Sequence, residues 1–145
     1  LDFINFICDI YDVSLEDRKV NIEKYSKMFE MDGKLGSDIS SFSHGMKQKV
    51  ALIAALSHNP DVLIMDEPFV GLDPKAVFDM KEVMHKMAKE GKTIFFSTHI
   101  LDVAEKLCDR VAIIKKGEIV KIGKMKDIKG DESLEQVFLE LGDNQ

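Results

Sequence analysis

The first third of the chain has the hydrophobic spacing of α-helices. Apolar side chains recur every three or four residues from Phe3 to Tyr11 and predict one helix with an apolar stripe. Ser14 and Asp17 form a capping-box pattern, which predicts the start of a second helix. The apolar face of this second helix would consist of Ile22, Tyr25 and Phe29. Residues 32–43 are rich in Gly, Ser and Asp and predict a loop, and a third helix would follow and stop near Pro60.

After Pro60 the pattern alternates between short apolar runs and helical spacing. The runs 62–65 and 93–97 predict two strands that are buried on both faces. Between them, Asp73 and Pro74 predict the N-cap and first position of a helix that ends at Gly91. Further along, a short helix, a hairpin and a final helix are predicted at 100–107, 111–122 and 134–141. This alternation predicts parallel strand pairing in an α/β layer.

Composition restricts the classes of function. The chain has 145 residues, 45% of them hydrophobic and 32% charged, and a net charge of −6. Nucleic-acid binders usually carry a basic footprint, so we expect no nucleic-acid partner. The longest apolar run, Val50 to Leu56, is far shorter than the roughly 20 residues that a membrane span needs. The two cysteines do not resemble a disulfide framework, and the chain begins at Leu1, so we expect a fragment of a longer protein from a reducing compartment.

Polar residues that could take part in catalysis or binding lie at the predicted strand ends and at one helix start. Asp66 and Glu67 follow the first strand, where Asp66 could hold Mg²⁺ and Glu67 could orient or deprotonate a water. His99 follows the second strand and could contact a phosphate. Ser43 and Gly45 open the third helix, whose N-terminus could bind an anion. Taken singly, each has a simpler interpretation: a solvated acidic turn, a helix-capping histidine and an ordinary serine N-cap.

Together and in this order, these segments resemble the C-terminal portion of the nucleotide-binding domain of ATP-binding cassette (ABC) transporters, which lies after the Walker A region. Residues 42–50 resemble the signature motif and residues 61–68 the Walker B strand with its glutamate. Residues 71–73 resemble the D-loop, and residues 97–99 resemble the switch-histidine loop. The resemblance covers essentially the whole chain.

The resemblance implies an α/β fold with an incomplete P-loop NTPase core. A mainly parallel sheet would be followed by a C-terminal hairpin, and an N-terminal helical subdomain would precede both. The implied domains are a helical subdomain at 1–42, with the signature helix at 43–58, and the second half of the catalytic core at 59–145. The strand that bears the P-loop would lie between the strands at 93–97 and 111–115, so we expect a gap in the sheet.

The resemblance also implies residue roles and partners. Two such domains would meet head to tail around ATP, and a transmembrane permease subunit would bind them at the cytoplasmic face of the membrane. Asp66 would organise Mg²⁺, Glu67 would polarise the attacking water and His99 would touch the γ-phosphate. Ser43 and Gly45 would bind the phosphate held by the partner chain. Asp73 belongs to the same nucleotide-binding set and would couple the two sites across the interface.

Two departures from the family pattern stand out. Against the usual Leu-Ser-Gly-Gly-Gln signature, the chain has Phe42, His44 and Met46, a variation similar to drug-efflux branches of the family. No G-x-x-x-x-G-K-S/T loop is present: its only possible end, residues 91–93, has Lys86 where the first glycine belongs and enters a predicted strand. We therefore expect an ATPase in the full-length protein and an inactive fragment.

Two other classes of function stay open. One is a non-transport ABC-type ATPase that acts as a clamp in DNA repair or translation. The other is a degenerate binding protein, although the presence of Asp66, Glu67 and His99 together argues against it.

Overall fold

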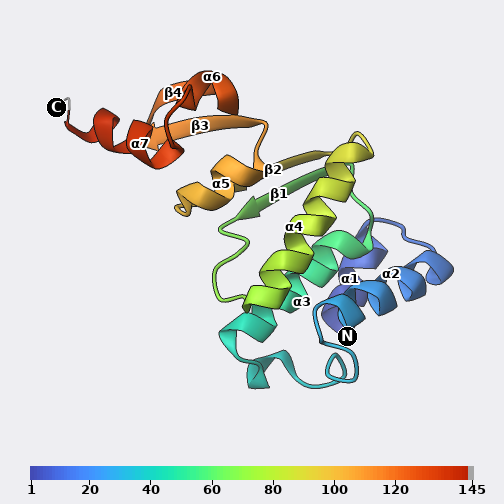
Figure 1. The fold of residues 1–145 in the computed structure, drawn as a ribbon. Helices are drawn as coiled ribbons and strands as arrows, with labels where there is room; N and C mark the ends of the chain where they lie inside the picture. The colour runs from blue at the N-terminus through green and yellow to red at the C-terminus, as the bar shows by residue number, and fades with distance from the viewer. Residues whose placement is uncertain (144–145) are drawn as a thin grey trace. The chain divides into compact units, whose positions relative to one another are not determined.

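The computed structural model describes residues 1–143, which form two compact units divided after Ser97 (Figure 1). The first unit contains α1 (Asp2–Ile10), α2 (Leu15–Met28), the 3₁₀ turn η1 (Ile39–Ser41), α3 (His44–Ser57), β1 (Val62–Asp66), α4 (Pro74–Lys89) and β2 (Thr93–Ser97). The second contains α5 (Leu101–Leu107), β3 (Arg110–Lys115), β4 (Glu118–Lys124), α6 (Met125–Lys129) and α7 (Leu134–Asp143). Each predicted helix and strand is present. α6 is an additional helix, which the sequence pattern did not predict because the helix is short.

The helix starts confirm the capping patterns. Ser14 Oγ accepts the backbone N–H of Asp17 at 3.1 Å and donates to its carboxylate at 2.7 Å. Asp73 Oδ1 accepts the N–H of Ala76 at 3.0 Å, and Pro74 occupies the first helical position of α4. These bonds satisfy backbone donors that have no partner inside the helix, so the local sequence determines where α2 and α4 begin.

The helical front of the chain packs around α3, which contacts both α1 and α2. Ile4, Cys8, Tyr25 and Ile53 are buried there. The apolar stripe predicted for α1 is not the face that is buried. Most of its residues are exposed, namely Phe3, Phe6, Ile10 and Tyr11. α1 is apolar on more than one side, and α3 covers only the side that carries Ile4 and Cys8.

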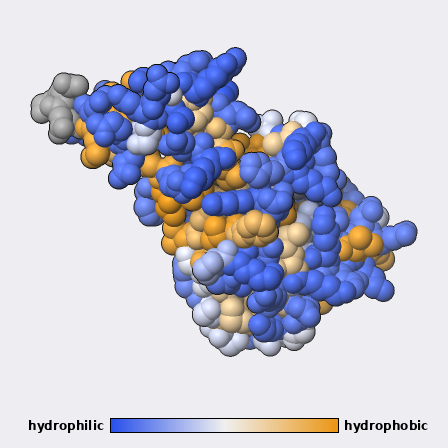
Figure 2. All heavy atoms as spheres, in the orientation of Figure 1, coloured by the Kyte–Doolittle hydropathy of each residue, from blue (hydrophilic) through white to orange (hydrophobic). Residues whose placement is uncertain are grey.

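In the first unit β1 pairs with β2 in parallel, and Asp66 lies opposite Ser97 in the register. The prediction that these strands are buried on both faces is wrong for the described chain. Leu63 is buried, whereas Val62, Ile64 and Phe95 keep 58%, 73% and 65% of their surface exposed. Figure 2 shows apolar residues at the surface on this face of the molecule. The cause is that one side of this sheet carries helices and the other is uncovered in the described residues.

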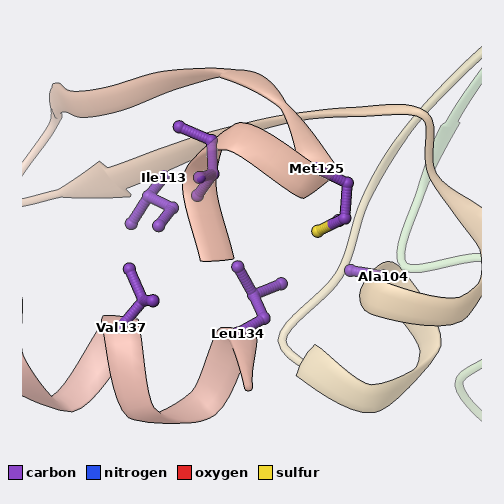
Figure 3. Packing of buried hydrophobic residues seen from close by; sticks show 6 residues of the cluster. Ala104, Ile113, Met125, Leu134 and Val137 are labelled. Carbon is purple, nitrogen blue, oxygen red and sulfur yellow. The ribbon is translucent and has the colours of Figure 1, made fainter. Parts of the chain in front are cut away.

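The second unit is built on an antiparallel hairpin of β3 and β4, as predicted, with Lys116 and Gly117 at the turn. Figure 3 shows its core, in which side chains from the hairpin and three helices meet. The buried members of this core are Ala104, Ile113, Met125, Ile128, Leu134 and Val137. Burial of these apolar side chains provides the main drive for the unit to fold.

Among residues 1–143, β2 pairs only with β1 and β3 only with β4. The gap expected between the strands at 93–97 and 111–115 stays a prediction. The division of the chain into domains at 42/43 and 58/59 stays a prediction, and the compact units divide the chain elsewhere. In the part of the chain that the structure describes, none of the helices combines the length and apolar character required to cross a membrane.

Candidate functional site

The carboxyl end of β1 carries the two predicted acidic residues, and β2 holds them in place. Asp66 is the last residue of β1, and Glu67 follows it directly. The hydroxyl of Ser97, at the end of β2, donates a hydrogen bond to Asp66 Oδ1 and accepts one from the Glu67 N–H at 3.1 Å. One side chain from β2 therefore binds both residues, and sequence reasoning had assigned Ser97 no role.

Glu67 has a backbone conformation that side chains other than glycine adopt rarely. Its φ is +45°, in the left-handed region, where Cβ crowds the backbone. Such conformations persist where the surrounding structure holds them, and they concentrate at functional sites. The half-buried Glu67 is followed by Pro68, which is fully buried and anchors the turn.

The start of α3 is the second part of the site. Ser43 is the N-cap, and its hydroxyl oxygen accepts the N–H of Met46 at 3.3 Å. His44 and Gly45 follow in the first turn, where backbone N–H groups have no carbonyl partner within the helix. With the positive end of the helix dipole, these donors make the α3 N-terminus suited to an anion.

This helix start lies directly against the turn that follows β1. A Cβ added to Gly45 would lie 2.5 Å from the carbonyl oxygen of Gly71, far inside the closest contact that a real Cβ makes. Gly71 itself has φ +79°, and a Cβ there would lie 2.7 Å from His44 Cδ2. The backbone approach therefore requires glycine at position 45, and the left-handed φ favours glycine at position 71. The tertiary fold thus brings the signature-like and D-loop-like segments together.

Polar contacts from α3 strengthen this approach. Lys49 Nζ lies 2.5 Å from Asp73 Oδ2, and the Lys49 side chain is only 12% exposed. Gln48 Nε2 donates to the carbonyl oxygen of Pro68 at 3.3 Å. The hydrogen bond from Lys49 and the Ala76 N–H lower the pKa of Asp73 to about 2. Both carboxylate oxygens of Asp73 thus have partners within its own chain. The sequence pattern predicted the helix cap and did not reveal the pair with Lys49.

His99 lies in the second unit, in the short link between β2 and α5. The next residue, Ile100, is the N-cap of α5 and donates its N–H to Thr98 Oγ1 at 3.1 Å. The role predicted for His99 stays a prediction. The two cysteines are free thiols, and burial raises the pKa of Cys8 and raises that of Cys108 to about 11, which agrees with inert packing residues.

Asp66, at the end of β1, offers a carboxylate of the kind that binds Mg²⁺. No group of three or more His, Cys, Asp or Glu side chains within residues 1–143 could enclose an ion. Mg²⁺ commonly binds through one or two carboxylates together with substrate phosphates and water, and Asp66 offers one such carboxylate. The residues present therefore fit a magnesium ion that arrives with a nucleotide.

Comparison with known proteins identifies the class of protein to which this fold belongs. A structure of an ATP-binding subunit of an ABC transporter superposes with a TM-score of 0.92 at 32% identity, covering 97% of this chain and 61% of that one. A dimeric post-hydrolysis state of an ATP-binding cassette, bound to ADP and Pi, gives a TM-score of 0.66 at 28% identity, covering 77% and 49%. The fold is therefore that of part of an ABC ATPase domain, a class of domain built on a P-loop NTPase core.

Sequence comparison agrees. An uncharacterized ABC transporter ATP-binding protein of Methanocaldococcus jannaschii is 38% identical over 128 residues, covering 88% of this chain and 49% of the relative. A family model described as "AAA domain, putative AbiEii toxin, Type IV TA system" matches residues 8–104. The chain belongs to the ABC transporter ATP-binding protein family. It spans about half the length of the curated relative.

Proposed function

We propose that this chain is part of an ATP-hydrolysing subunit that powers an ABC transporter. The observation that carries the proposal is the arrangement at the end of β1, where Asp66 and Glu67 are adjacent and both bound by Ser97. In phosphoryl transfer the protein mainly positions the reactants and stabilises charge, and two carboxylates held at a strand end suit that task.

In this proposal Asp66 holds the magnesium ion, which would neutralise charge on the nucleotide phosphates. Glu67 orients and polarises the attacking water as a general base. His99 contacts the γ-phosphate from the same chain. The left-handed backbone of Glu67 supports its role, because it turns the side chain away from the direction that a regular strand would give it.

The α3 N-terminus binds the phosphate of ATP held by a second copy of the domain, in a head-to-tail dimer. Ser43 supports this assignment because its oxygen accepts the Met46 N–H, which leaves the hydroxyl hydrogen able to donate to an anion. The related cassette described as a dimer with ADP and Pi supports the dimeric arrangement. Asp73 couples the two sites, by way of the turn that it caps.

The phosphate-binding loop would lie in a further part of the protein. The exposed apolar face of β1 and β2 supports this, because buried apolar strands in α/β proteins are covered by layers on both sides. A transmembrane permease subunit would receive the motion of the domains at the cytoplasmic face of the membrane. The direction of transport would be export, supported by the signature variant with Phe42, His44 and Met46.

The test is ATP hydrolysis by the full-length protein with Glu67→Gln. We expect phosphate release to be lost while ATP-dependent dimer formation persists, because the substitution keeps the shape and removes the carboxylate. Glu82→Gln is the matched control, since Glu82 is an exposed glutamate on α4. Hydrolysis within a few-fold of the parent rate in Glu67→Gln would overturn the proposed role. Stimulation of hydrolysis by a co-reconstituted permease would separate a transporter from a non-transport clamp.

A further inference from the structure

Ser97 connects the two acidic residues of the site, and we infer that it is a positioning residue for hydrolysis. The inference rests on the proposed function, because it assigns Ser97 the task of fixing Glu67 and Asp66 in their working geometry. Ser97 acts through these two residues, by holding them in place.

The geometry uses both capacities of one hydroxyl group. Ser97 Oγ donates its hydrogen to Asp66 Oδ1 and, with a lone pair, accepts the Glu67 N–H at 3.1 Å. The parallel register places Ser97 directly opposite Asp66. The Ser97 hydroxyl therefore reaches the Asp66 carboxylate and the Glu67 N–H while the pairing of the two strands stays regular. The two contacts span 30 and 31 residues of sequence and join β2 to the acidic turn.

The bond to the Glu67 N–H matters because of the backbone at that residue. With φ at +45°, Glu67 is in a conformation that costs free energy relative to the extended region. A hydrogen bond to its N–H helps to hold the amide in this orientation, and the amide determines where Cα directs the carboxylate. Without it, we expect Glu67 to sample other conformations and its carboxylate to leave the water-orienting position more often.

The bond to Asp66 fixes the carboxylate beside it. A donor on Oδ1 restricts rotation of the Asp66 side chain and keeps one oxygen directed toward β2. The other oxygen then has a defined direction in which to meet a cation. Ser97 and Asp66 are both exposed at the sheet edge, so these bonds add little to core packing. A role in positioning therefore explains the pair better than a role in folding alone.

The experiment compares Ser97→Ala, Ser97→Thr and Thr93→Ala in the full-length protein. Ser97→Ala removes the hydroxyl, Ser97→Thr keeps it on a side chain that suits a strand, and Thr93→Ala deletes a hydroxyl from the opposite end of β2. We expect kcat to fall about tenfold in Ser97→Ala with KM for ATP unchanged, because positioning affects the barrier more than binding. Ser97→Thr should restore kcat, and Thr93→Ala should match the parent.

A second measurement does not depend on ATP hydrolysis. Hydrogen exchange of the Glu67 amide, followed by NMR without nucleotide, should be faster in Ser97→Ala than in the parent and slow again in Ser97→Thr. If the parent protein hydrolyses no ATP, the proposed function fails, and the amide measurement still tests the hydrogen bond. Parent kcat in Ser97→Ala, no rescue by Ser97→Thr, or unchanged amide exchange would each overturn the inference.

Discussion

Lys49 and Asp73 form an ion pair that joins the helix of the signature-like segment to the N-cap of α4. The Nζ to Oδ2 distance is 2.5 Å, and the same carboxylate caps α4 through the Ala76 N–H. Asp73 thus serves two purposes with its two oxygens. Because α3 contacts both Pro68 and Asp73, the pair ties the N-terminal part of α3 to the acidic turn within one chain.

The two roles of Asp73 can be separated by substitution. Asp73→Asn keeps an oxygen for the cap and loses the charge, whereas Asp73→Ala loses both. We expect Asp73→Asn to cost less than about 1 kcal/mol, since the pair is partly exposed, and Asp73→Ala to cost about 1 kcal/mol more. Urea unfolding measures both. Equal stabilities of the two variants would contradict the capping role.

The low pKa of Asp73 predicts that the difference in stability between the parent and Asp73→Asn depends on pH. The folded-state pKa of about 2 lies below the ordinary value of 3.8, so the charged carboxylate stabilises the folded protein above pH 3.8. This stabilisation should decline as the pH falls from 3.8 toward 2. The stability difference between the parent and Asp73→Asn should therefore shrink over this range. A difference that stays constant from pH 5 to pH 2 would show that the charge does not contribute.

The close approach of Gly45 and Gly71 predicts an intolerant position. Gly45→Ala places a methyl group 2.5 Å from a backbone oxygen that cannot move alone, and we expect it to cost about 1–3 kcal/mol. Gly36→Ala is the control, because a Cβ at Gly36 meets nothing within 4 Å. Thermal unfolding of the two variants distinguishes them. If Gly45→Ala is as stable as Gly36→Ala, the helix start does not lie against the turn as described.

His99 carries a prediction for activity. In the full-length protein, His99→Ala should lower ATP turnover about tenfold or more, because a contact to the γ-phosphate is lost. His85→Ala on the exposed side of α4 is the control and should leave turnover unchanged. Steady-state phosphate release is the measurement. Parent turnover in His99→Ala would return this residue to the simpler interpretation, a histidine near a helix start.

The exposed strand face predicts self-association of the isolated 145-residue chain. Light scattering over a concentration series should detect species larger than 16.4 kDa, since Ile64 and Phe95 present uncovered apolar surface. Ile64→Lys should reduce this association, while Val20→Lys, at another exposed apolar residue on α2, should not. Equilibrium dialysis should show no tight binding of Mg-ATP to this chain. A monodisperse monomer that hydrolyses ATP would contradict both expectations.

The sequence by itself determined the family, the starts of α2 and α4, and every helix and strand except α6. The helix starts depend on contacts within three residues of Ser14, Asp73 and Pro74, so they can be predicted without knowledge of the tertiary structure. The strand runs were also recognisable, but their burial was not. Val62, Ile64 and Phe95 were expected inside, and they are exposed because burial depends on which layers cover a strand.

Only the tertiary structure decided how the site is assembled. Ser97 reaches Asp66 and Glu67 across 31 and 30 residues, and no local spacing encodes that contact. Lys49 lies within the signature-like segment, but the sequence assigned it no role. Its partner, Asp73, is evident only from the structure, in which α3 lies beside the start of α4. The physical reason is the range of the interactions: capping and periodicity act along the chain, whereas these hydrogen bonds and ion pairs exist only after distant segments have packed together.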